Sequence, residues 1–331
     1  MIKKLSLALI STMLPASCGN NPDPSTSEDE GDYSQLKIVS PTGAPTLAIF
    51  TEGNNPNWET KSTPTLVNAE LQNNNYDVVI APAYGALDSI KEFSCDFALA
   101  RVITGGNFYL VGINKSAEDR PTSDSYIVGF AHQDVSGKVL EELYKNHWNL
   151  GEPTNIDWVN GAADTLGILK AGHRGGKAVD YVLTAEPVFT NAKSQLDEGV
   201  TLVETYDIRK EWKDYSNQDA LVQAGVFLRK SAIESKRSQF KALLNKIDEN
   251  IELATTPETI KDVVATLNAY NEDVKKQAAR FGYNANLVNA LQSNNKNRFG
   301  LVRKEVTIDV NAFLTKLGDE PYDSSYFVTL E

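Results

Sequence analysis

Five short segments carry the polar side chains that would perform recognition or catalysis in this chain. They are residues 40–46, 81–85, 132–136, 160–164 and 184–187, and each follows an apolar run. Hydroxyls, amides, prolines and small residues dominate them, and none contains lysine or arginine. Hydroxyls and amides both donate and accept hydrogen bonds, and glycine allows a ligand to approach the backbone closely. These segments predict recognition of a small polar or heterocyclic molecule.

The candidate ligand-binding residues come from these segments and from a glycine-broken stretch between them. They are Ser40, Thr42, Gly43, Ala44, Pro82, Ala83, Tyr84, Asn107, Tyr109, Gln133, Asp134, Ser136, Asn160 and Glu186. Asp134 and Glu186 have two open interpretations. Either carboxylate accepts hydrogen bonds from an amino group or a cationic heterocycle, or it caps the start of a helix. A bound anion would depend on helix N-termini alone, because the segments lack cations.

The sequence matches catalytic motifs only in part. Residues 172–177 are one residue short of a phosphate-binding loop, and Ala178 stands where serine or threonine is needed, so we interpret them as a helix end and turn. Ser238 and Lys241 match S-x-x-K, but the companion motifs of that chemistry are missing. The sequence contains no G-x-S-x-G, H-E-x-x-H or C-x-x-C. It therefore predicts neither an enzyme nor a cofactor or metal site.

Length and composition exclude several classes of protein. A chain of 331 residues predicts about two domains, and 41% hydrophobic residues exclude wholesale disorder. No apolar run reaches the roughly 20 residues of a membrane span, which excludes a multi-span membrane protein. The net charge of −12 argues against a nucleic-acid partner, and two cysteines with three histidines argue against a disulfide scaffold or zinc module.

The first 35 residues predict export. A basic start, an apolar run from Leu5 to Leu14 and small residues before Cys18 are typical of a signal peptide over residues 1–17. Cys18 after Ala-Ser resembles the lipobox of bacterial lipoproteins, although Pro15 stands where leucine is usual; the alternative is an ordinary signal peptide with a spare cysteine. Residues 18–35 predict a flexible tether. The expected location is the outer face of the cell membrane, held by a lipid on Cys18.

The rest of the chain alternates apolar strands with helical patterns, which predicts an α/β fold with parallel strands. Residues 77–82 and 180–187 repeat one plan, an acidic residue, a buried strand and a proline-containing loop, and so predict two comparable lobes. Residues 101–114 and 221–228 are candidate crossovers, and two crossings would form a hinge. From Ser231 onward the pattern predicts helices that cover the first lobe. Cys95 is expected to be a small buried hydrophobe.

The order of these motifs resembles a known family. The matching stretches are Lys37–Pro45, Tyr76–Pro82, Val128–Gly129, Lys177–Pro187, Glu211–Trp212 and Gln223–Phe227. They are similar to the solute-binding lipoproteins of ABC importers with the type-2 periplasmic-binding-protein fold, in the NMT1/SsuA-like branch.

The resemblance implies a two-lobed clamp with a C-terminal helical layer. Lobe 1 is expected to comprise residues 36–110 and 222–331, and lobe 2 residues 111–221. A monomer would capture a small solute between the lobes and deliver it to an ABC permease. Two alternatives stay open: a surface lipoprotein that senses or adheres with the same fold, and an enzyme on this fold. The enzymes of this kind are cytoplasmic and lack a signal peptide, so the N-terminal segment argues against the second.

Overall fold

The computed structural model describes residues 31–293 and 297–330. The predicted signal peptide, Cys18 and residues 18–30 of the predicted tether lie outside the described residues. Within the tether's described end, the Tyr33 hydroxyl donates a hydrogen bond to Glu52 Oε1 at 3.1 Å, and the ring packs against an apolar cluster. The described chain therefore begins in contact with the globular body.

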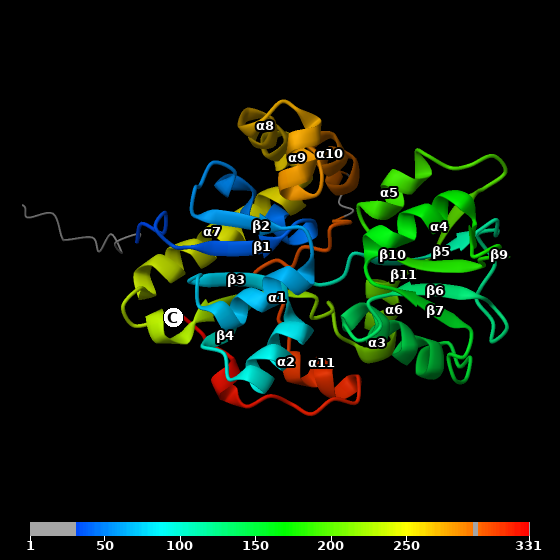
Figure 1. Cartoon of the computed structure of the whole chain (residues 1–331), viewed down its shortest axis with the longest axis horizontal. Helices are drawn as coiled ribbons and strands as arrows, with labels where there is room; N and C mark the ends of the chain where they lie inside the picture. Colours follow the sequence, from blue (N-terminus) through cyan, green and yellow to red (C-terminus); the bar gives the residue numbers. More distant parts are fainter. Residues whose placement is uncertain (1–30, 294–296, 331) are drawn as a thin grey trace, which may run out of the picture. The chain divides into compact units, whose positions relative to one another are not determined.

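The first five-stranded sheet has parallel strands on one side and antiparallel strands on the other (Figure 1). Its order is β2 (Trp58–Lys61), β1 (Ile38–Pro41), β3 (Val78–Pro82), β12 (Ala224–Arg229) and β4 (Phe97–Thr104). β2, β1 and β3 are parallel, and β12 is antiparallel to both of its neighbours. This sheet and the helices packed on it are called lobe 1.

The second five-stranded sheet repeats that plan. Its order is β7 (Ile156–Val159), β6 (Ile127–Phe130), β10 (Tyr181–Ala185), β5 (Phe108–Ile113) and β11 (Leu202–Asp207). β7, β6 and β10 are parallel, and β5 is antiparallel to both of its neighbours. This sheet and its helices are called lobe 2. The same strand order and the same directions in both sheets confirm the two comparable lobes that the sequence repeat predicted.

Asp77 and Asp180 have the same role in the two lobes. The backbone N–H of Lys37, just before β1, donates to Asp77 Oδ2 at 3.0 Å. The backbone N–H of Tyr126, just before β6, donates to Asp180 Oδ2 at 2.9 Å. The other carboxylate oxygen of each aspartate pairs with a lysine, at 2.7 Å and 2.6 Å. Each aspartate thus joins the start of the central strand to its parallel neighbour.

Two crossovers connect the lobes. The first runs from β4 to β5 through Gly105, Gly106 and Asn107. The second leads from α6 (Ile208–Ser216) in lobe 2 to β12 in lobe 1. The Leu221 N–H of the second crossover donates to the Gly105 carbonyl of the first at 2.9 Å, so the two run side by side. Both predicted crossovers are confirmed.

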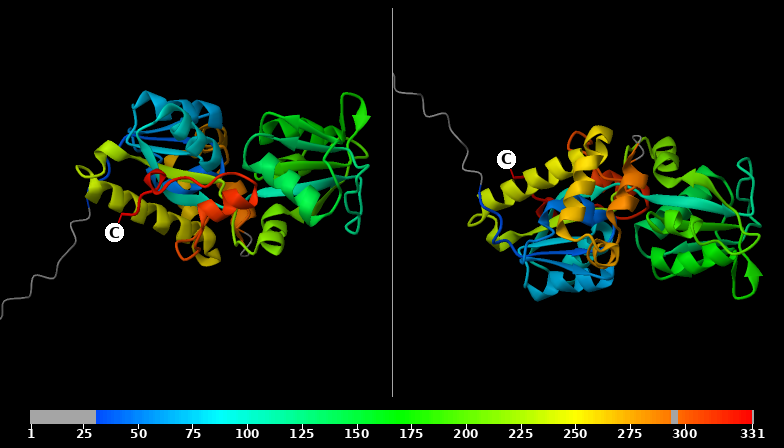
Figure 2. Two further views of the ribbon diagram at one scale, coloured as in Figure 1. Left: turned by 90° about the horizontal axis from the view of Figure 1, so that it is seen from below. Right: turned by 90° about the horizontal axis from the view of Figure 1, so that it is seen from above.

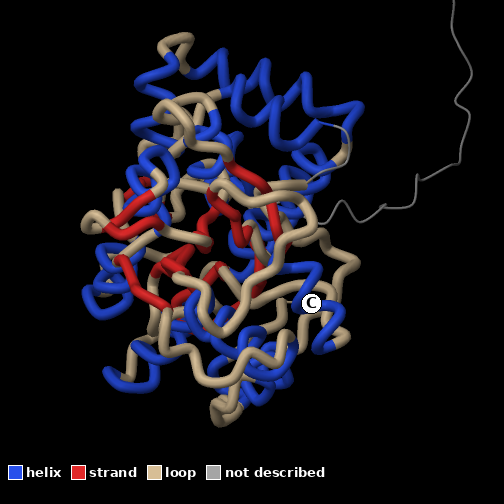
Figure 3. The backbone as a smooth tube through the Cα atoms, turned by 90° about the vertical axis from the view of Figure 1, so that its right-hand side faces the viewer, coloured by secondary structure: helices blue, strands red, loops and turns tan. Residues whose placement is uncertain are grey.

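In the molecule as a whole, strands lie in the interior and helices outside (Figure 3). The helices that belong to lobe 1 are more numerous. They are η1 (Ala44–Glu52), α1 (Pro64–Asn73), α2 (Ala83–Phe93), η4 (Lys230–Ala232), α7 (Arg237–Thr255), η5 (Pro257–Thr259), α8 (Ile260–Tyr270), α9 (Val274–Phe281), α10 (Ala285–Gln292), α11 (Val310–Lys316) and η7 (Ser324–Tyr326). Phe240, Leu243 and Ile247 of α7 are buried in one apolar cluster with residues of β1 and β3, which confirms the predicted C-terminal helical layer.

Lobe 2 has shorter helices. They are α3 (Val135–Glu142) with its continuation η2 (Leu143–His147), η3 (Ala162–Asp164), α4 (Thr165–Ala171), α5 (Val188–Lys193) and α6. The glycine-rich stretch after α4 is a helix cap, as predicted: Gly172 has φ of 74°, and β8 (His173–Arg174) and β9 (Lys177–Ala178) form a small hairpin. Cys95 is buried, as predicted.

The C-terminal residues connect the apolar interiors of the lobes. Figure 2 shows α11 at the boundary between them. Phe313 of α11 is 1% exposed and its ring lies 5.1 Å from that of Trp212 on α6 of lobe 2. One cluster of buried apolar residues therefore extends from Leu99 of lobe 1 through Phe313 to Val139 of lobe 2. Among the described residues, no helix is both long and apolar enough to cross a membrane.

Candidate functional site

The predicted recognition segments all lie at the carboxyl ends of parallel strands. Residues 40–46 and 81–85 follow the carboxyl ends of β1 and β3 in lobe 1. Residues 132–136, 160–164 and 184–187 occupy the same positions after β6, β7 and β10 in lobe 2. Ligands of open parallel sheets bind outside the carboxyl ends of the strands. The strand topology thus gathers segments far apart in the sequence into one set in each lobe.

One contact at the boundary between the lobes joins the neighbourhoods of the two sets. Lys138, in the first turn of α3, places its Nζ 4.7 Å from the centre of the Tyr84 ring in lobe 1. The same Nζ lies 3.0 Å from Asp319 Oδ1 in the C-terminal segment. Lys138 stabilises this contact through a cation–π interaction and an ion pair. The carboxyl ends of β3 and β6 therefore face each other.

In lobe 1, some of the predicted ligand-binding residues are buried and contact other parts of the protein. Ser40 is fully buried, and its Oγ accepts a hydrogen bond from Trp58 Nε1 at 3.0 Å. Ala44 and Ala83 are also buried. Tyr84 is 8% exposed. Thr42, Gly43 and Pro82 are partly exposed and remain accessible to a solute.

In lobe 2, Gln133 and Asn160 are exposed, whereas Ser136 is buried and its Oγ donates to the Phe130 carbonyl at 3.1 Å. Asp134 caps α3 by accepting a hydrogen bond from the Val135 N–H at 2.7 Å. Burial raises the pKa of Asp134 above its ordinary value, and the negative charge of a nearby aspartate adds to the rise. Asp134 thus performs the capping role that the sequence left open.

Asn107 lies in the first crossover and has all of its polar side-chain atoms engaged. Its Nδ2 donates to the Glu186 carbonyl at 2.7 Å, and its Oδ1 accepts from Gln223 Nε2 at 2.7 Å. The Gln223 Oε1 in turn accepts from the Gly106 N–H at 3.0 Å. Asn107 therefore ties both crossovers to the loop after β10, and it is only 3% exposed.

Glu186 forms a buried ion pair that the sequence did not indicate. Its side chain is 0% exposed, and Oε1 accepts from Arg298 Nε at 2.9 Å. The Thr190 N–H and hydroxyl donate to its two oxygens, each at 3.1 Å, so Glu186 also caps α5. The Tyr109 ring is 1% exposed and lies 4.0 Å from the Arg298 guanidinium. Burial raises the pKa of Tyr109 above its ordinary value. With its charge balanced by Arg298, Glu186 is not an open acceptor for a cation.

Arg298 and Lys138 are the cations that the sequence analysis missed. Arg298 is 112 residues from Glu186 along the chain, and no local pattern links the two. The position of Lys138 could have been noticed in the sequence, because it lies in the first turn of the helix that follows residues 132–136. The boundary between the lobes therefore contains cations as well as hydroxyls and amides. Among the described residues, no group of histidine, cysteine, aspartate and glutamate side chains could hold a metal ion.

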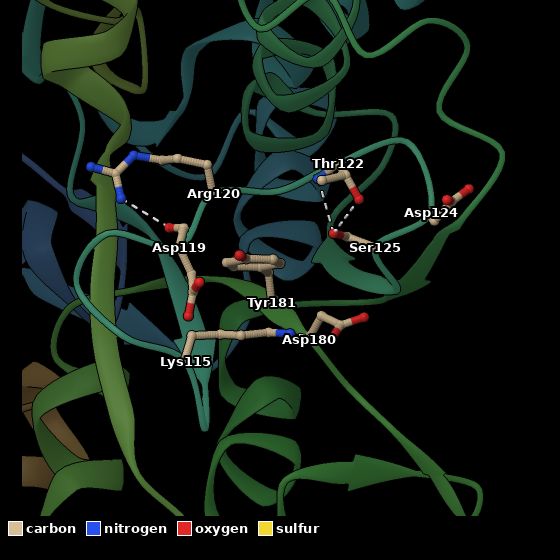
Figure 4. A pocket seen from close by; sticks show the side chains of 8 residues that line it. All are labelled: Lys115, Asp119, Arg120, Thr122, Asp124, Ser125, Asp180 and Tyr181. Atoms are coloured by element: carbon tan, nitrogen blue, oxygen red, sulfur yellow. Dashed lines mark hydrogen bonds and ion pairs between the residues drawn. The ribbon is translucent and has the colours of Figure 1, made fainter.

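A polar hollow of about 330 Å³ lies in lobe 2 at the amino ends of β6 and β10, away from the predicted segments (Figure 4). Its lining contains two cations, Lys115 and Arg120, and three aspartates, Asp119, Asp124 and Asp180. Lys115 Nζ lies 2.6 Å from Asp180 Oδ1, and Arg120 donates to the backbone carbonyls of Ala117 and Asp119 at 2.8 Å and 2.9 Å. None of the predicted ligand-binding residues lines this hollow. The ion pair and these backbone hydrogen bonds hold strand ends and loops together.

Solved structures share this fold. An ABC transporter structure from Parabacteroides distasonis matches with a TM-score of 0.63 and 16% identity over 88% of this chain and 98% of that chain. The ligand-binding component of an ABC-type import system from Staphylococcus aureus, with zinc bound, matches with a TM-score of 0.62 and 13% identity over 88% and 95%. The periplasmic aliphatic sulphonate-binding protein SsuA from Escherichia coli matches with a TM-score of 0.59 and 15% identity over 86% and 85%.

No protein-family model matches the chain, and no curated protein sequence matches it. The similarity to solved structures shows the fold: the chain has the two-lobed α/β fold of the solute-binding proteins of ABC importers. The fold expected from the sequence resemblance is confirmed.

Proposed function

We propose that this protein is an extracytoplasmic solute-binding lipoprotein that captures a small polar or heterocyclic solute between its lobes and delivers it to an ABC importer permease. The observation that carries the proposal is a contact between the lobes beside the loops that follow β3 and β6. Tyr84 of lobe 1 lies against Lys138 of lobe 2, so a solute bound there contacts both lobes. A ligand that contacts both lobes favours the closed arrangement, because it binds that arrangement more tightly.

The solute site in this proposal uses the accessible members of the predicted set. Thr42, Gly43 and Pro82 supply lobe 1, and Gln133 and Asn160 supply lobe 2. Tyr84, which is only 8% exposed, follows Pro82 at the same strand end. The buried members, such as Ser40 and Ser136, support the loops through their hydrogen bonds. Recognition then depends on amide and hydroxyl groups and on stacking against an aromatic ring. This chemistry suits an uncharged polar or heterocyclic solute.

The proposal includes attachment to the membrane through a lipid on Cys18 and a monomeric state. The sequence predicted a tether over residues 18–35, but Tyr33 packs on the globular body, so the proposed tether ends before that residue. The sequence placed the lobe limits at residues 36–110 with 222–331 for lobe 1 and residues 111–221 for lobe 2. The limit at residue 110 falls inside β5, whose residues pair with β10 and β11 of lobe 2 from Phe108 onward, so the proposed first limit is the crossover at Gly105–Asn107. A monomer suits the mechanism because closure requires both lobes to move freely.

A thermal-shift screen tests the proposal. The full chain, with Cys18 replaced by serine to prevent lipidation, is screened against heterocycles, amino acids, sulfonates and oxyanions. A solute at a thousandfold excess over its dissociation constant stabilises the protein by about 4 kcal/mol, which raises Tm by several degrees. The solute must be recovered chemically unchanged. The proposal fails if no class of small solute shifts Tm, and a lipoprotein that senses or adheres would then be favoured.

A further inference from the structure

The pair formed by Arg298 and Glu186 lies at the joint between the lobes, and each partner belongs to a different lobe. Arg298 is held in lobe 1 by the residue that follows it. Phe299 is fully buried in the apolar core of lobe 1, with its ring 5.1 Å from that of Tyr283. Leu301 pairs with Thr104 at the edge of β4. The backbone around Arg298 therefore moves with lobe 1.

The guanidinium of Arg298 leaves this lobe and makes its charged contacts in lobe 2. Its Nε and one terminal nitrogen both lie 2.9 Å from Glu186 Oε1, and the other terminal nitrogen lies 2.8 Å from Glu204 Oε2 on β11. The aromatic rings of Tyr109 and Phe189 lie 4.0 Å and 5.7 Å from it. Lobe 2 thus forms a cage of two carboxylates and two rings around a cation from lobe 1.

This cage is next to the crossovers. The Gly105 N–H of the first crossover donates to the Gly300 carbonyl at 2.7 Å, two residues after Arg298. Gly300 has φ of 65°, and a Cβ there would overlap the carbonyl of Gly106. The chain needs glycine at this position to pass so close to the joint. Glu186 is tied to the same joint, because its N–H donates to the Asn107 carbonyl at 3.0 Å.

We propose that Arg298 is the hinge pin of this protein: its guanidinium, carried by lobe 1, fills a carboxylate and aromatic cage on lobe 2 and so sets the orientation in which the two halves of the solute site meet. Arg298 is a positioning residue, because it acts through the orientation of the lobes and not through contact with solute. A buried carboxylate left without its cation is strongly unfavourable, so loss of Arg298 allows lobe 2 to rotate until water reaches Glu186.

The distance between the lobes tests the proposal directly. Spin labels are attached to Gln72→Cys on α1 and Ser194→Cys after α5, which are exposed positions in different lobes. Cys18 is replaced by serine and Cys95 by alanine, so that only the introduced cysteines are labelled. We expect one narrow distance distribution in this background. With Arg298→Ala we expect the distribution to shift, split or become roughly twice as broad, because a second orientation is populated.

The chain offers a matched control. Arg303 is also an arginine of the C-terminal segment, but its partners Thr255, Thr256 and Glu252 are all in lobe 1. Arg303→Ala is expected to leave the distance distribution unchanged even if it lowers Tm. A second test variant is Glu204→Gln. Glu204 is 35% exposed, and Glu186 keeps its ion pair with Arg298 in this variant, so no buried carboxylate loses its cation. We expect a smaller change of the same kind.

Chemical rescue distinguishes loss of the guanidinium from the cage from a general loss of packing. Millimolar methylguanidinium is expected to occupy the cage of Arg298→Ala and restore the narrow distribution. The proposal is overturned if Arg298→Ala leaves the distribution unchanged, or if it changes the distribution in a way that methylguanidinium does not reverse. It rests on the proposed function for the use of the lobe orientation, but the measurement contains no solute. If the distance measurement contradicts the role of Arg298, the result of the solute screen still holds. If the solute screen finds no ligand, the distance measurement still tests the role of Arg298.

Discussion

The apolar connection through α11 makes a quantitative prediction for Phe313→Ala. Phe313 is 1% exposed and lies between Trp212 of lobe 2 and the apolar cluster that reaches lobe 1. Removing a buried phenyl ring takes away roughly 150 Å² of apolar contact, which at about 25 cal/mol per Å² is about 4 kcal/mol. The cavity left behind adds to the cost, and the expected total loss is about 3–5 kcal/mol. This is a large part of the roughly 5–15 kcal/mol that stabilises a typical domain.

Urea denaturation checks this prediction. Unfolding is followed by tryptophan fluorescence, which reports mostly on lobe 2 because three of the four tryptophans, Trp148, Trp158 and Trp212, lie there. Far-UV circular dichroism reports on both lobes. In the unmodified chain the two signals should change together, because one apolar cluster spans both lobes. In Phe313→Ala we expect a lower midpoint and two transitions that no longer coincide.

A control of the same residue type is available in lobe 1. Phe93 is 52% exposed at the end of α2, so Phe93→Ala should change the free energy of unfolding by no more than about 0.5 kcal/mol. The reasoning is refuted if Phe313→Ala costs less than about 1 kcal/mol and both signals still coincide. In that case α11 would cover the lobes without connecting their cores.

Three further predictions follow from the same contacts. Tyr84→Ala and Asn160→Ala, in different lobes, should each weaken binding of a solute found in the screen by at least about tenfold in calorimetric titration, equal to about 1.4 kcal/mol; unchanged affinity in both would place the pocket elsewhere. Burial alone would raise the pKa of Asp180, but hydrogen bonds from its lysine partner and a backbone N–H hold this pKa below its ordinary value. A lowered folded-state pKa stabilises the protein above the ordinary aspartate pKa, and this contribution is lost as pH falls through the folded value. Asp180→Asn should therefore lower Tm at pH 7 and have little effect near pH 3, and an equal loss at both would contradict this. Gly300→Ala should cost more than about 1 kcal/mol because of its positive φ and the overlap with the crossover, whereas Gly167→Ala, in α4 with open space around it, should stabilise by about 0.5–1 kcal/mol; urea midpoints that move in the same direction would refute the comparison.

Much of the fold could be predicted because its signals are local. Apolar runs such as those around β3 and β10 identify buried strands, and the stripe that includes Phe240 and Ile247 identifies a helix with one buried face. The repeat at Asp77 and Asp180 indicated two similar lobes. The structure explains why an aspartate stands at both places, since each accepts a hydrogen bond from the backbone that begins the neighbouring strand.

The candidate site was predicted in part. Strand ends place the recognition loops correctly in each lobe, because parallel strands bring their carboxyl ends to one edge. Exposure within those loops could not be predicted: Ser40 and Ser136 have the same hydroxyl chemistry as accessible residues, yet both are buried by tertiary contacts. The capping role of Asp134 was an open alternative, and only the geometry of α3 decided it.

The sequence by itself determined the buried strands such as β1, β3, β6 and β10, the helix faces, the two crossovers and the polar character of the loops, because each depends on residues that are neighbours along the chain. It predicted parallel strands, and only the structure showed that β12 and β5 run antiparallel to their neighbours. Only the tertiary structure decided which charges meet. Glu186 and Arg298 are 112 residues apart, and Lys138 and Asp319 are 181 apart. Such pairs are made when separately folded segments pack, and nothing in the spacing of either residue encodes its partner. The ionic joint between the lobes is therefore a property of the packed molecule.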